Sequence, residues 1–155
     1  MNRFAWASAT TISEAAMAAS VIVADAMTAP LGAASPDAAS RDAAGSGDMS
    51  IVQAGGIDVL DLLKEGLLAP RTIASLREVP GLDAIVEQDG GGLRIGAMVT
   101  LARLADHAVL RQRCPALAEA VRGSASPQIR NVATLGGNLL QRPRCWYFRR
   151  RNTAA

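Results

Sequence analysis

The sequence predicts an α+β fold, and three observations carry that prediction. Short β-prone runs alternate with segments of helical spacing. Two of the β-prone runs flank a glycine-rich turn, and two glycine pairs elsewhere each follow an apolar run. Alternation of strands and helices favours crossover units, whereas the glycine-rich turn favours a β-hairpin. We therefore predict the order β-α-β-α-β-β-β-α-α-β, with one hairpin, rather than a doubly wound sheet.

The N-terminal region predicts one strand and one helix. Phe4–Ser8 is β-prone, and the hydroxyl residues from Thr10 to Ser13 can cap a helix over Glu14–Met27. The following residues, Thr28–Asp48, are Ala, Ser, Gly, Pro and Asp with almost no large apolar side chain. Such a composition cannot form a packed core, so we expect a flexible loop or an insertion there.

A strand–helix–strand pattern comes next. Met49–Gln53 is β-prone and leads into the first glycine pair, and Asp58–Leu68 has apolar residues at helical spacing. Pro70 ends that helix because proline cannot continue it. Thr72–Leu76 is a further short strand.

The second half predicts a hairpin followed by helices. Ala84–Glu87 and Leu93–Ile95 are β-prone and flank three consecutive glycines. Thr100 is placed to cap a helix over Leu101–Ala105. A longer helix, interrupted or started by Pro115, is expected to reach Arg122, with Gly123 as its C-cap. The β-prone stretch Val132–Leu135 predicts the last strand.

Composition limits the possible functions. The 155 residues carry a net charge of +2, which does not demand a nucleic-acid partner. The sequence contains no uncharged apolar run of about 18 residues, so we expect no membrane span. The two cysteines show no disulfide framework, which favours a reducing, cytoplasmic compartment. Cys114 is expected to be a buried small hydrophobe, and His107 a surface or capping residue.

The two glycine pairs are the candidate binding site. Gly55 and Gly56 connect a predicted strand to a predicted helix, and Gly136 and Gly137 follow a turn that contains Arg130. Without a Cβ atom, the backbone N–H groups can approach an anion closely, and positive φ is accessible. The alternative is a pair of tight turns that need glycine for conformation alone. Two such loops favour a cofactor that carries a diphosphate.

The surroundings of these loops resemble a known family. IVQAGGIDVLDLL and SPQIRNVATLGGNLLQRPRCWYF are similar to the FAD-binding subunit of molybdenum hydroxylases, which have a FAD-binding domain of the PCMH type. The likeness covers residues 51–148 well and 1–27 loosely. It implies the N-terminal portion of such a domain: a β-α-β subdomain, a β-hairpin and helices. We expect the chain to divide into a first strand and helix of the FAD subdomain (1–27), a flexible loop or insertion (28–48), the core of the FAD-binding subdomain (49–148) and a basic C-terminal tail (149–155).

The resemblance implies which residues contact the FAD diphosphate and ribityl regions. Carried over by position, they are Ala54, Gly55, Gly56, Ile57, Asp58, Ala133, Thr134, Gly136, Gly137 and Asn138. Ile57 departs from the family pattern, which has a threonine whose hydroxyl could bind a phosphate oxygen. Asp58 and Asp61 are expected in the first turn of a helix, where Asp58 either complements the helix dipole or faces the cofactor.

The implied activity is that of a subunit of a molybdopterin-dependent oxidoreductase. Electrons would pass from iron–sulfur centres through FAD to an acceptor, and the implied partners are a molybdopterin-binding large subunit and a 2Fe-2S small subunit. Export to the periplasm with a partner is the alternative to a cytoplasmic location. No residue of this chain is expected to act as a catalytic acid, base or nucleophile.

The C-terminal segment QRPRCWYFR resembles one branch of the family, in which a 4Fe-4S cluster is bound. Cys145 matches the first cluster ligand, but no cysteine follows it, so the missing ligands would have to be supplied from elsewhere. Trp146, Tyr147 and Phe148 are expected to pack on the second FAD subdomain or a partner, or else to stack on a base. Two rival functions stay open: a truncated interaction fragment that does not bind FAD, and a small nucleic-acid-binding module that uses the arginine-rich tail.

Overall fold

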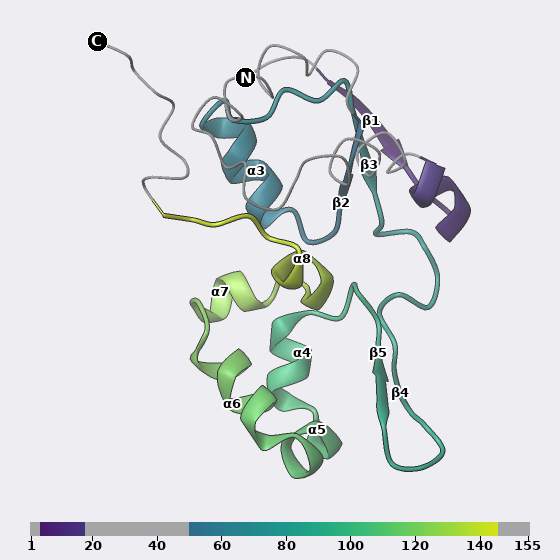
Figure 1. The fold of residues 1–155 in the computed structure, drawn as a ribbon, viewed down its shortest axis with the longest axis vertical. Helices are drawn as coiled ribbons and strands as arrows, with labels where there is room; N and C mark the ends of the chain where they lie inside the picture. Colours follow the sequence, from purple (N-terminus) through teal and green to yellow (C-terminus); the bar gives the residue numbers. More distant parts are fainter. Residues whose placement is uncertain (1–3, 18–49, 146–155) are drawn as a thin grey trace, which may run out of the picture. The chain divides into compact units, whose positions relative to one another are not determined.

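The computed structural model describes residues 4–17 and 50–145 of the chain (Figure 1). The described residues form two compact units. The first unit contains the described residues up to Gln53 together with 58–78 and 142–145, and the second contains 54–57 and 79–141. The expected segments 28–48 and 149–155 lie outside the described residues, as does most of the helix that was expected over Glu14–Met27.

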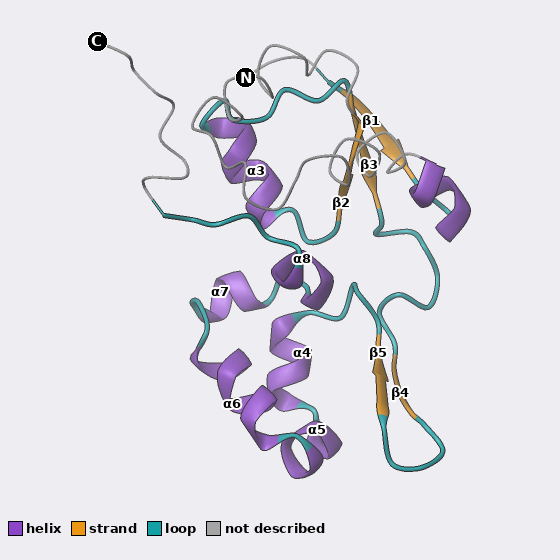
Figure 2. Cartoon of the chain, viewed as in Figure 1, coloured by secondary structure: helices purple, strands orange, loops and turns teal. Residues whose placement is uncertain are grey.

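The first unit is a three-stranded parallel sheet with one covering helix. Strands β1 (Ala5–Ser8), β3 (Thr72–Ser75) and β2 (Ser50–Gln53) lie in the order β1-β3-β2. Helix α3 (Ile57–Lys64) connects β2 to β3 as a crossover (Figure 2). Ile51, Ile73 and Leu63 form the core between sheet and helix. The three strand predictions are therefore confirmed to within one residue at each end.

Helix α3 ends four residues before the predicted boundary at Leu68. Gly66 has a φ of 68°, and the Leu67 N–H donates to the Leu62 carbonyl at 2.8 Å. A glycine in the left-handed conformation with a returning hydrogen bond is the usual way that an α-helix stops. The turn brings Leu68 back against the core of the first unit. The apolar spacing beyond Lys64 thus reflects a turn that packs on the core, and the prediction of a helix there was wrong.

The helix that follows β1 covers residues 12–17 in the described part of the chain. Thr11 caps it, because its Oγ1 accepts a hydrogen bond from the Glu14 N–H at 3.1 Å. Glu14 in turn accepts hydrogen bonds from the backbone N–H of Thr10, at 2.8 Å, and from its hydroxyl, at 3.0 Å. These bonds, led by the one from the Thr10 backbone, lower the pKa of the Glu14 carboxyl below its ordinary 4.5.

Glu14 is expected to make folding sensitive to acid. A carboxyl whose pKa is lowered on folding adds stability above its unfolded pKa of 4.5, and this stability is lost as the pH falls through the folded value. We measure the free energy of unfolding in urea above and below pH 4.5, and we expect it to fall less with acid in Glu14→Gln than in wild type. Glu119→Gln, on the exposed face of a helix in the second unit, is the control. An unchanged pH slope in Glu14→Gln would contradict this assignment.

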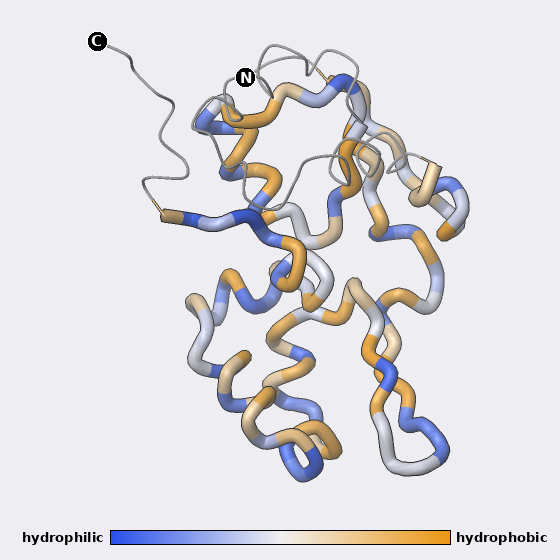
Figure 3. Tube along the Cα trace, in the orientation of Figure 1, coloured by the Kyte–Doolittle hydropathy of each residue, from blue (hydrophilic) through white to orange (hydrophobic). Residues whose placement is uncertain are grey.

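The second unit combines a β-hairpin with five short helices in the described residues. Strands β4 (Ile85–Glu87) and β5 (Leu93–Ile95) pair antiparallel, as predicted. The turn of the hairpin is hydrophilic, whereas its strands carry apolar segments (Figure 3). The helices are α4 (Leu101–Asp106), α5 (Ala108–Arg113), α6 (Pro115–Gly123), α7 (Pro127–Arg130) and α8 (Leu135–Leu139).

The core of the second unit lies between α4, α5 and α6. Val99, Leu104 and Leu110 are fully buried in it, and Ile57 and Leu135 pack against it. Arg113 links the helices to the hairpin through an ion pair with Glu87 at 2.9 Å and a hydrogen bond to the Gly91 carbonyl. In the described part of the chain, no helix is long and apolar enough to cross a membrane.

Candidate functional site

The two glycine loops, which lie about 80 residues apart in the sequence, meet within the second unit. A Cβ atom added to Gly55 would lie 2.3 Å from the Val132 carbonyl oxygen and 3.2 Å from the Thr134 nitrogen. Real Cβ contacts are never that short, so this meeting of two backbones requires glycine at position 55. The structure therefore brings the two predicted halves of the site together.

The first loop connects β2 to α3, as the sequence predicted. Gly56 has a φ of 86°, a conformation that side chains rarely adopt. Within the described residues, the N–H groups of Gly55, Gly56 and Ile57 have no acceptor in the protein. The N-terminus of α3 follows at once, and the first turn of a helix also leaves N–H groups without intrahelical partners. This loop is rich in unused hydrogen-bond donors and carries the positive end of a helix dipole.

The second loop is a short helix rather than the predicted strand. Thr134 makes a single bridge with Thr100, and α8 then begins at Leu135. The Thr134 side chain is buried and caps α8 by accepting from the Gly137 N–H at 3.3 Å. The β-prone residues of Val132–Leu135 therefore do not form a strand, because the threonine hydroxyl starts a helix in the middle of them.

Gly136 and Gly137 lie in a helix, and their N–H groups are used within the protein. Neither has positive φ, and both lie in α8. The Gly136 N–H donates to the Ala97 carbonyl at 2.9 Å, and a Cβ atom at Gly136 would lie 2.8 Å from the Ala97 Cβ. The Gly137 N–H is used by the Thr134 cap, and the Asn138 N–H donates to the Thr134 carbonyl. The N–H groups of Gly136, Gly137 and Asn138 are therefore used within the protein, and Gly136 also allows close packing against Ala97.

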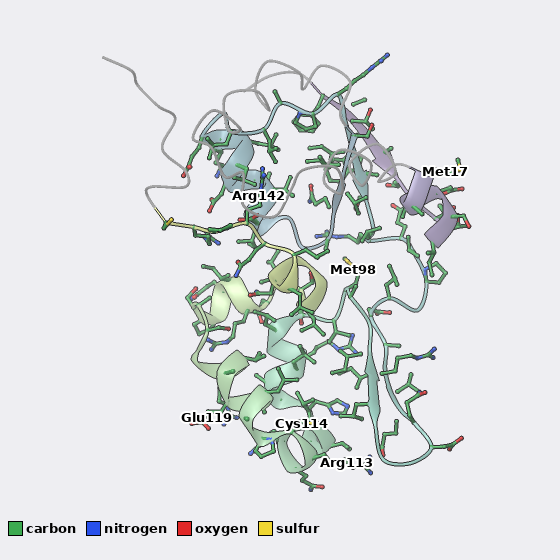
Figure 4. The ribbon with its side chains drawn as sticks, in the orientation of Figure 1. Met17, Met98, Arg113, Cys114, Glu119 and Arg142 are labelled. Atoms are coloured by element: carbon green, nitrogen blue, oxygen red, sulfur yellow. The ribbon has the colours of Figure 1, made fainter. Side chains whose placement is uncertain are left out.

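The acidic residues of α3 are engaged by the C-terminal segment of the first unit. Asp58 Oδ2 accepts a hydrogen bond from the Arg142 N–H at 3.3 Å, and Asp61 forms an ion pair with Arg144. Figure 4 shows Arg142 beside α3. Asp58 lies in the first turn of the helix, whereas Asp61 lies one turn later, so the expectation for Asp61 was wrong. The sequence left open whether Asp58 complements the helix dipole or faces the cofactor. In the structure, one of its carboxylate oxygens binds the protein's own backbone.

Arg130 serves the backbone of its own turn. Its Nη1 donates to the Ser124 carbonyl at 2.9 Å and to the Ala125 carbonyl at 2.8 Å. Ala125 has a φ of 50°, which is unfavourable for a residue with a Cβ atom. The arginine therefore holds a strained turn that leads into α7 and the second loop.

We expect Ala125→Gly to stabilise the protein by up to about 1 kcal/mol, because glycine adopts positive φ without steric cost. Urea unfolding measures this directly. The control is Ala120→Gly on the exposed side of α6, which should destabilise by about 1 kcal/mol because its conformation is helical. Equal losses in both variants would show that the turn at 125 carries no strain.

The remaining candidates fall outside the site. His107 caps α5, with its Nδ1 accepting from the Leu110 N–H at 3.3 Å, as expected. Cys114 is exposed at the break between α5 and α6 (Figure 4), so the expectation that it is buried was wrong: the proline after it interrupts the helix. Cys145 is an exposed thiol, and the described residues contain no group of three or more potential metal ligands. Trp146, Tyr147 and Phe148 lie outside the described residues.

A family model described as "FAD binding domain in molybdopterin dehydrogenase" matches residues 31–145. The aldehyde oxidoreductase FAD-binding subunit PaoB of Escherichia coli K12 is 46% identical over 95 residues, which are 61% of this chain and 30% of that protein. The carbon monoxide dehydrogenase medium chain of Hydrogenophaga pseudoflava is 35% identical over 86 residues, 56% of this chain and 30% of the relative.

The fold is also similar to that of solved structures. The crystal structure of quinoline 2-oxidoreductase from Pseudomonas putida 86 matches with a TM-score of 0.64 and 28% identity, covering 88% of this chain and 39% of that one. The chain spans about 30% of the length of the two curated relatives, PaoB and the carbon monoxide dehydrogenase medium chain.

Proposed function

The chain belongs to the family of FAD-binding domains of molybdopterin dehydrogenases, and from this premise we propose that it binds FAD as part of an oxidoreductase subunit. The observation that carries the proposal is the meeting of the two glycine loops in one unit, with unused N–H donors on one of them. A diphosphate needs donors and positive potential, and the first loop offers both. The residues present therefore fit the cofactor.

The two loops are assigned different tasks. Gly55, Gly56 and Ile57 would donate their N–H groups to the diphosphate, and the loss of a threonine hydroxyl at position 57 leaves that backbone donor in place. Ala54 contributes a small side chain beside Gly137. Asp58 would contribute through its backbone, because one of its carboxylate oxygens accepts from Arg142.

The second loop would pack against the first loop and hold it in place. Ala133 and Thr134 are buried and fix the start of α8. Gly136 and Gly137 allow the close packing, and Asn138 is the half-buried polar residue of that helix. Packing of this kind holds the donors of the first loop in place before the ligand arrives, which reduces the ordering cost of binding.

The bound flavin would supply the redox chemistry, accepting electrons from iron–sulfur centres and delivering them to an acceptor. The chain's own residues would bind and orient it. We propose a molybdopterin-binding large subunit and a 2Fe-2S small subunit as partners. The support is that the relatives are named as a FAD-binding subunit and as a medium chain, which are parts of larger enzymes.

The residues present do not make an iron–sulfur site by themselves. A four-iron cluster is held by four thiolates, and the sequence has two cysteines, Cys114 and Cys145, which lie in different units. The role of Cys145 as a first cluster ligand would need further ligands from another chain or segment.

The test is to purify the chain alone and together with its molybdopterin-binding partner, and to record the flavin absorbance of each preparation. Colour in the chain alone supports a competent site in these residues. Colour only in the complex supports a site completed by a partner. No colour in either would overturn the proposal and favour the interaction fragment. The exposed Leu139 and Leu140, at 75% and 85% of their full accessibility, are the observation that supports that second candidate.

A further inference from the structure

The turn between α6 and α7 is strained, and one arginine holds it. Ala125 has a φ of 50° and is the one residue other than glycine with positive φ among the described residues. A residue with a Cβ atom keeps such a conformation only where surrounding contacts hold it. Arg130 supplies these contacts, because its Nη1 donates to the carbonyls of Ser124 and Ala125 at 2.9 and 2.8 Å. The arginine thus determines the conformation in which the chain leaves α6.

Helix α7 connects this turn to the second glycine loop. Ser126 caps the helix by accepting from the Ile129 N–H at 3.3 Å. The N–H groups of Val132 and Ala133 then both donate to the Ile129 carbonyl, at 3.0 and 2.8 Å. Ala133 is also fixed from the other side, since its carbonyl accepts from the Leu101 N–H at 2.9 Å. Val132 therefore lies between this contact with α4 and the turn that the arginine holds.

Val132 is the residue that meets the first glycine loop. A Cβ atom added to Gly55 would lie 2.3 Å from the Val132 carbonyl oxygen, so this carbonyl determines how close the backbone of the first loop can come. Gly55, Gly56 and Ile57 carry the N–H groups that have no acceptor among the described residues. These residues belong to the second unit, as do the turn and α7. A path of backbone contacts within one unit therefore leads from the arginine to the donors.

We propose that Arg130 is a positioning residue for the cofactor. By holding the turn at Ala125, it sets the Val132 carbonyl against Gly55 and so fixes the directions of the N–H groups that would bind the diphosphate. This inference rests on the proposed function. The guanidinium is assigned no contact with the cofactor, since its Nη1 is used by the two carbonyls of the turn. Preorganised donors reduce the ordering cost of binding, so loss of the arginine lowers affinity as well as stability.

The experiment combines two substitutions that are expected to offset each other. Arg130→Met removes the hydrogen bonds and keeps most of the side-chain volume, whereas Ala125→Gly lets the turn adopt positive φ without the arginine. Both single variants, the double variant and wild type are compared as the full chain, or in the complex if FAD requires the partner. Arg122→Met, in the exposed last turn of α6, is the matched control for the loss of one positive charge. Should Arg130→Met fail to fold, Arg130→Lys, which has a shorter side chain and no planar guanidinium, takes its place.

Dissociation constants for FAD and inorganic pyrophosphate are measured below the unfolding temperature of each variant. We expect Arg130→Met to weaken both about three- to tenfold, the cost of ordering a loop that is preorganised in wild type. The double variant should regain most of the lost affinity, and Ala125→Gly and Arg122→Met should bind as wild type does. Unchanged affinity in Arg130→Met overturns the inference, because the arginine then serves stability alone. An equal loss in Arg122→Met, or no recovery in the double variant, also overturns it, because net charge or a direct contact then accounts for the loss.

A measurement without ligand separates this inference from the proposed function. Nitrogen–proton correlation spectra record the backbone amide signals of Gly55, Gly56 and Ile57. We expect these signals to move in Arg130→Met and to return toward their wild-type positions in the double variant. If they do so while no preparation binds FAD, the proposed function fails and the path from the arginine to the first loop is confirmed. If FAD binds but the signals stay in place, the inference fails and the proposed function stands.

Discussion

Gly55→Ala is expected to separate the two glycine loops and to cause a large loss of both stability and FAD affinity. The new Cβ would lie 2.3 Å from the Val132 carbonyl oxygen; the backbone fixes the positions of both atoms, so no side-chain rotation can relieve the contact. Overpacking of a well-packed site costs about 1–3 kcal/mol, and we expect the upper end of that range at this position. FAD binding in the proposed site requires the wild-type arrangement of the loops, and a cost of about 1.4 kcal/mol to restore it would lower the affinity about tenfold.

Urea unfolding and flavin titration measure the two effects of Gly55→Ala separately. The control is Gly123→Ala, since a Cβ at Gly123 meets nothing within 4 Å and this glycine ends α6. Alanine is the better helix former, so the control should gain about 0.5–1 kcal/mol of stability. If Gly55→Ala unfolds at the same urea concentration as wild type and binds FAD equally well, the two loops do not meet in solution as described.

The second large effect is expected for Gly136→Ala. Whether the substitution raises or lowers the free energy of unfolding tests the close packing of α8. Alanine in place of glycine inside an exposed helix would stabilise by about 1 kcal/mol. In α8, however, the new Cβ would lie 2.8 Å from the Ala97 Cβ and 3.0 Å from the Ala97 carbonyl oxygen. We therefore expect a net destabilisation of about 1–3 kcal/mol, measured by urea unfolding. The double variant Gly136→Ala/Ala97→Gly should recover only part of the loss, because the contact with the backbone oxygen persists.

Gly137→Ala provides the comparison within the same pair. Its Cβ would lie 3.1 Å from the Thr134 hydroxyl and 3.8 Å from the Ala54 Cβ, which are both side-chain atoms. The gain in helix propensity of about 1 kcal/mol should largely offset this strain, so we expect little change in the free energy of unfolding. Equal losses at Gly136 and Gly137 would contradict the separate roles assigned to them.

The strands of the first unit could be predicted from the sequence because their signals are local. Short apolar runs such as Thr72–Leu76 and Met49–Gln53 are bounded by turn residues, and the structure places strands there. The hairpin around the three glycines was predicted for the same reason. The Thr100 and His107 caps could also be predicted from the sequence, since each is a contact between residues three positions apart.

The failed predictions at Val132–Leu135 and Cys114 followed the average composition of a segment and missed a helix start or the consequence of a helix break within it. Val132–Leu135 is β-prone by composition, but Thr134 caps a helix there, and its only strand-like contact within the described residues is with Thr100. Cys114 was expected to be buried because it was placed on an apolar helix, yet the proline after it breaks the helix and the thiol is exposed. The break at Pro115 was itself predicted, but its consequence for the exposure of Cys114 was not.

The sequence by itself determined the α+β class, the positions of the strands in the first unit, the hairpin and the two glycine loops, because these depend on propensity and on residues close together in the chain. Only the tertiary structure decided what the loops do. Gly55 and Gly136 are required by backbone contacts with Val132 and Ala97. The N–H groups of Gly55, Gly56 and Ile57 and the buried Gln53 oxygen lack hydrogen-bond partners among the described residues. Close approach and unsatisfied hydrogen bonds are properties of atoms far apart in the chain, so no local pattern encodes them.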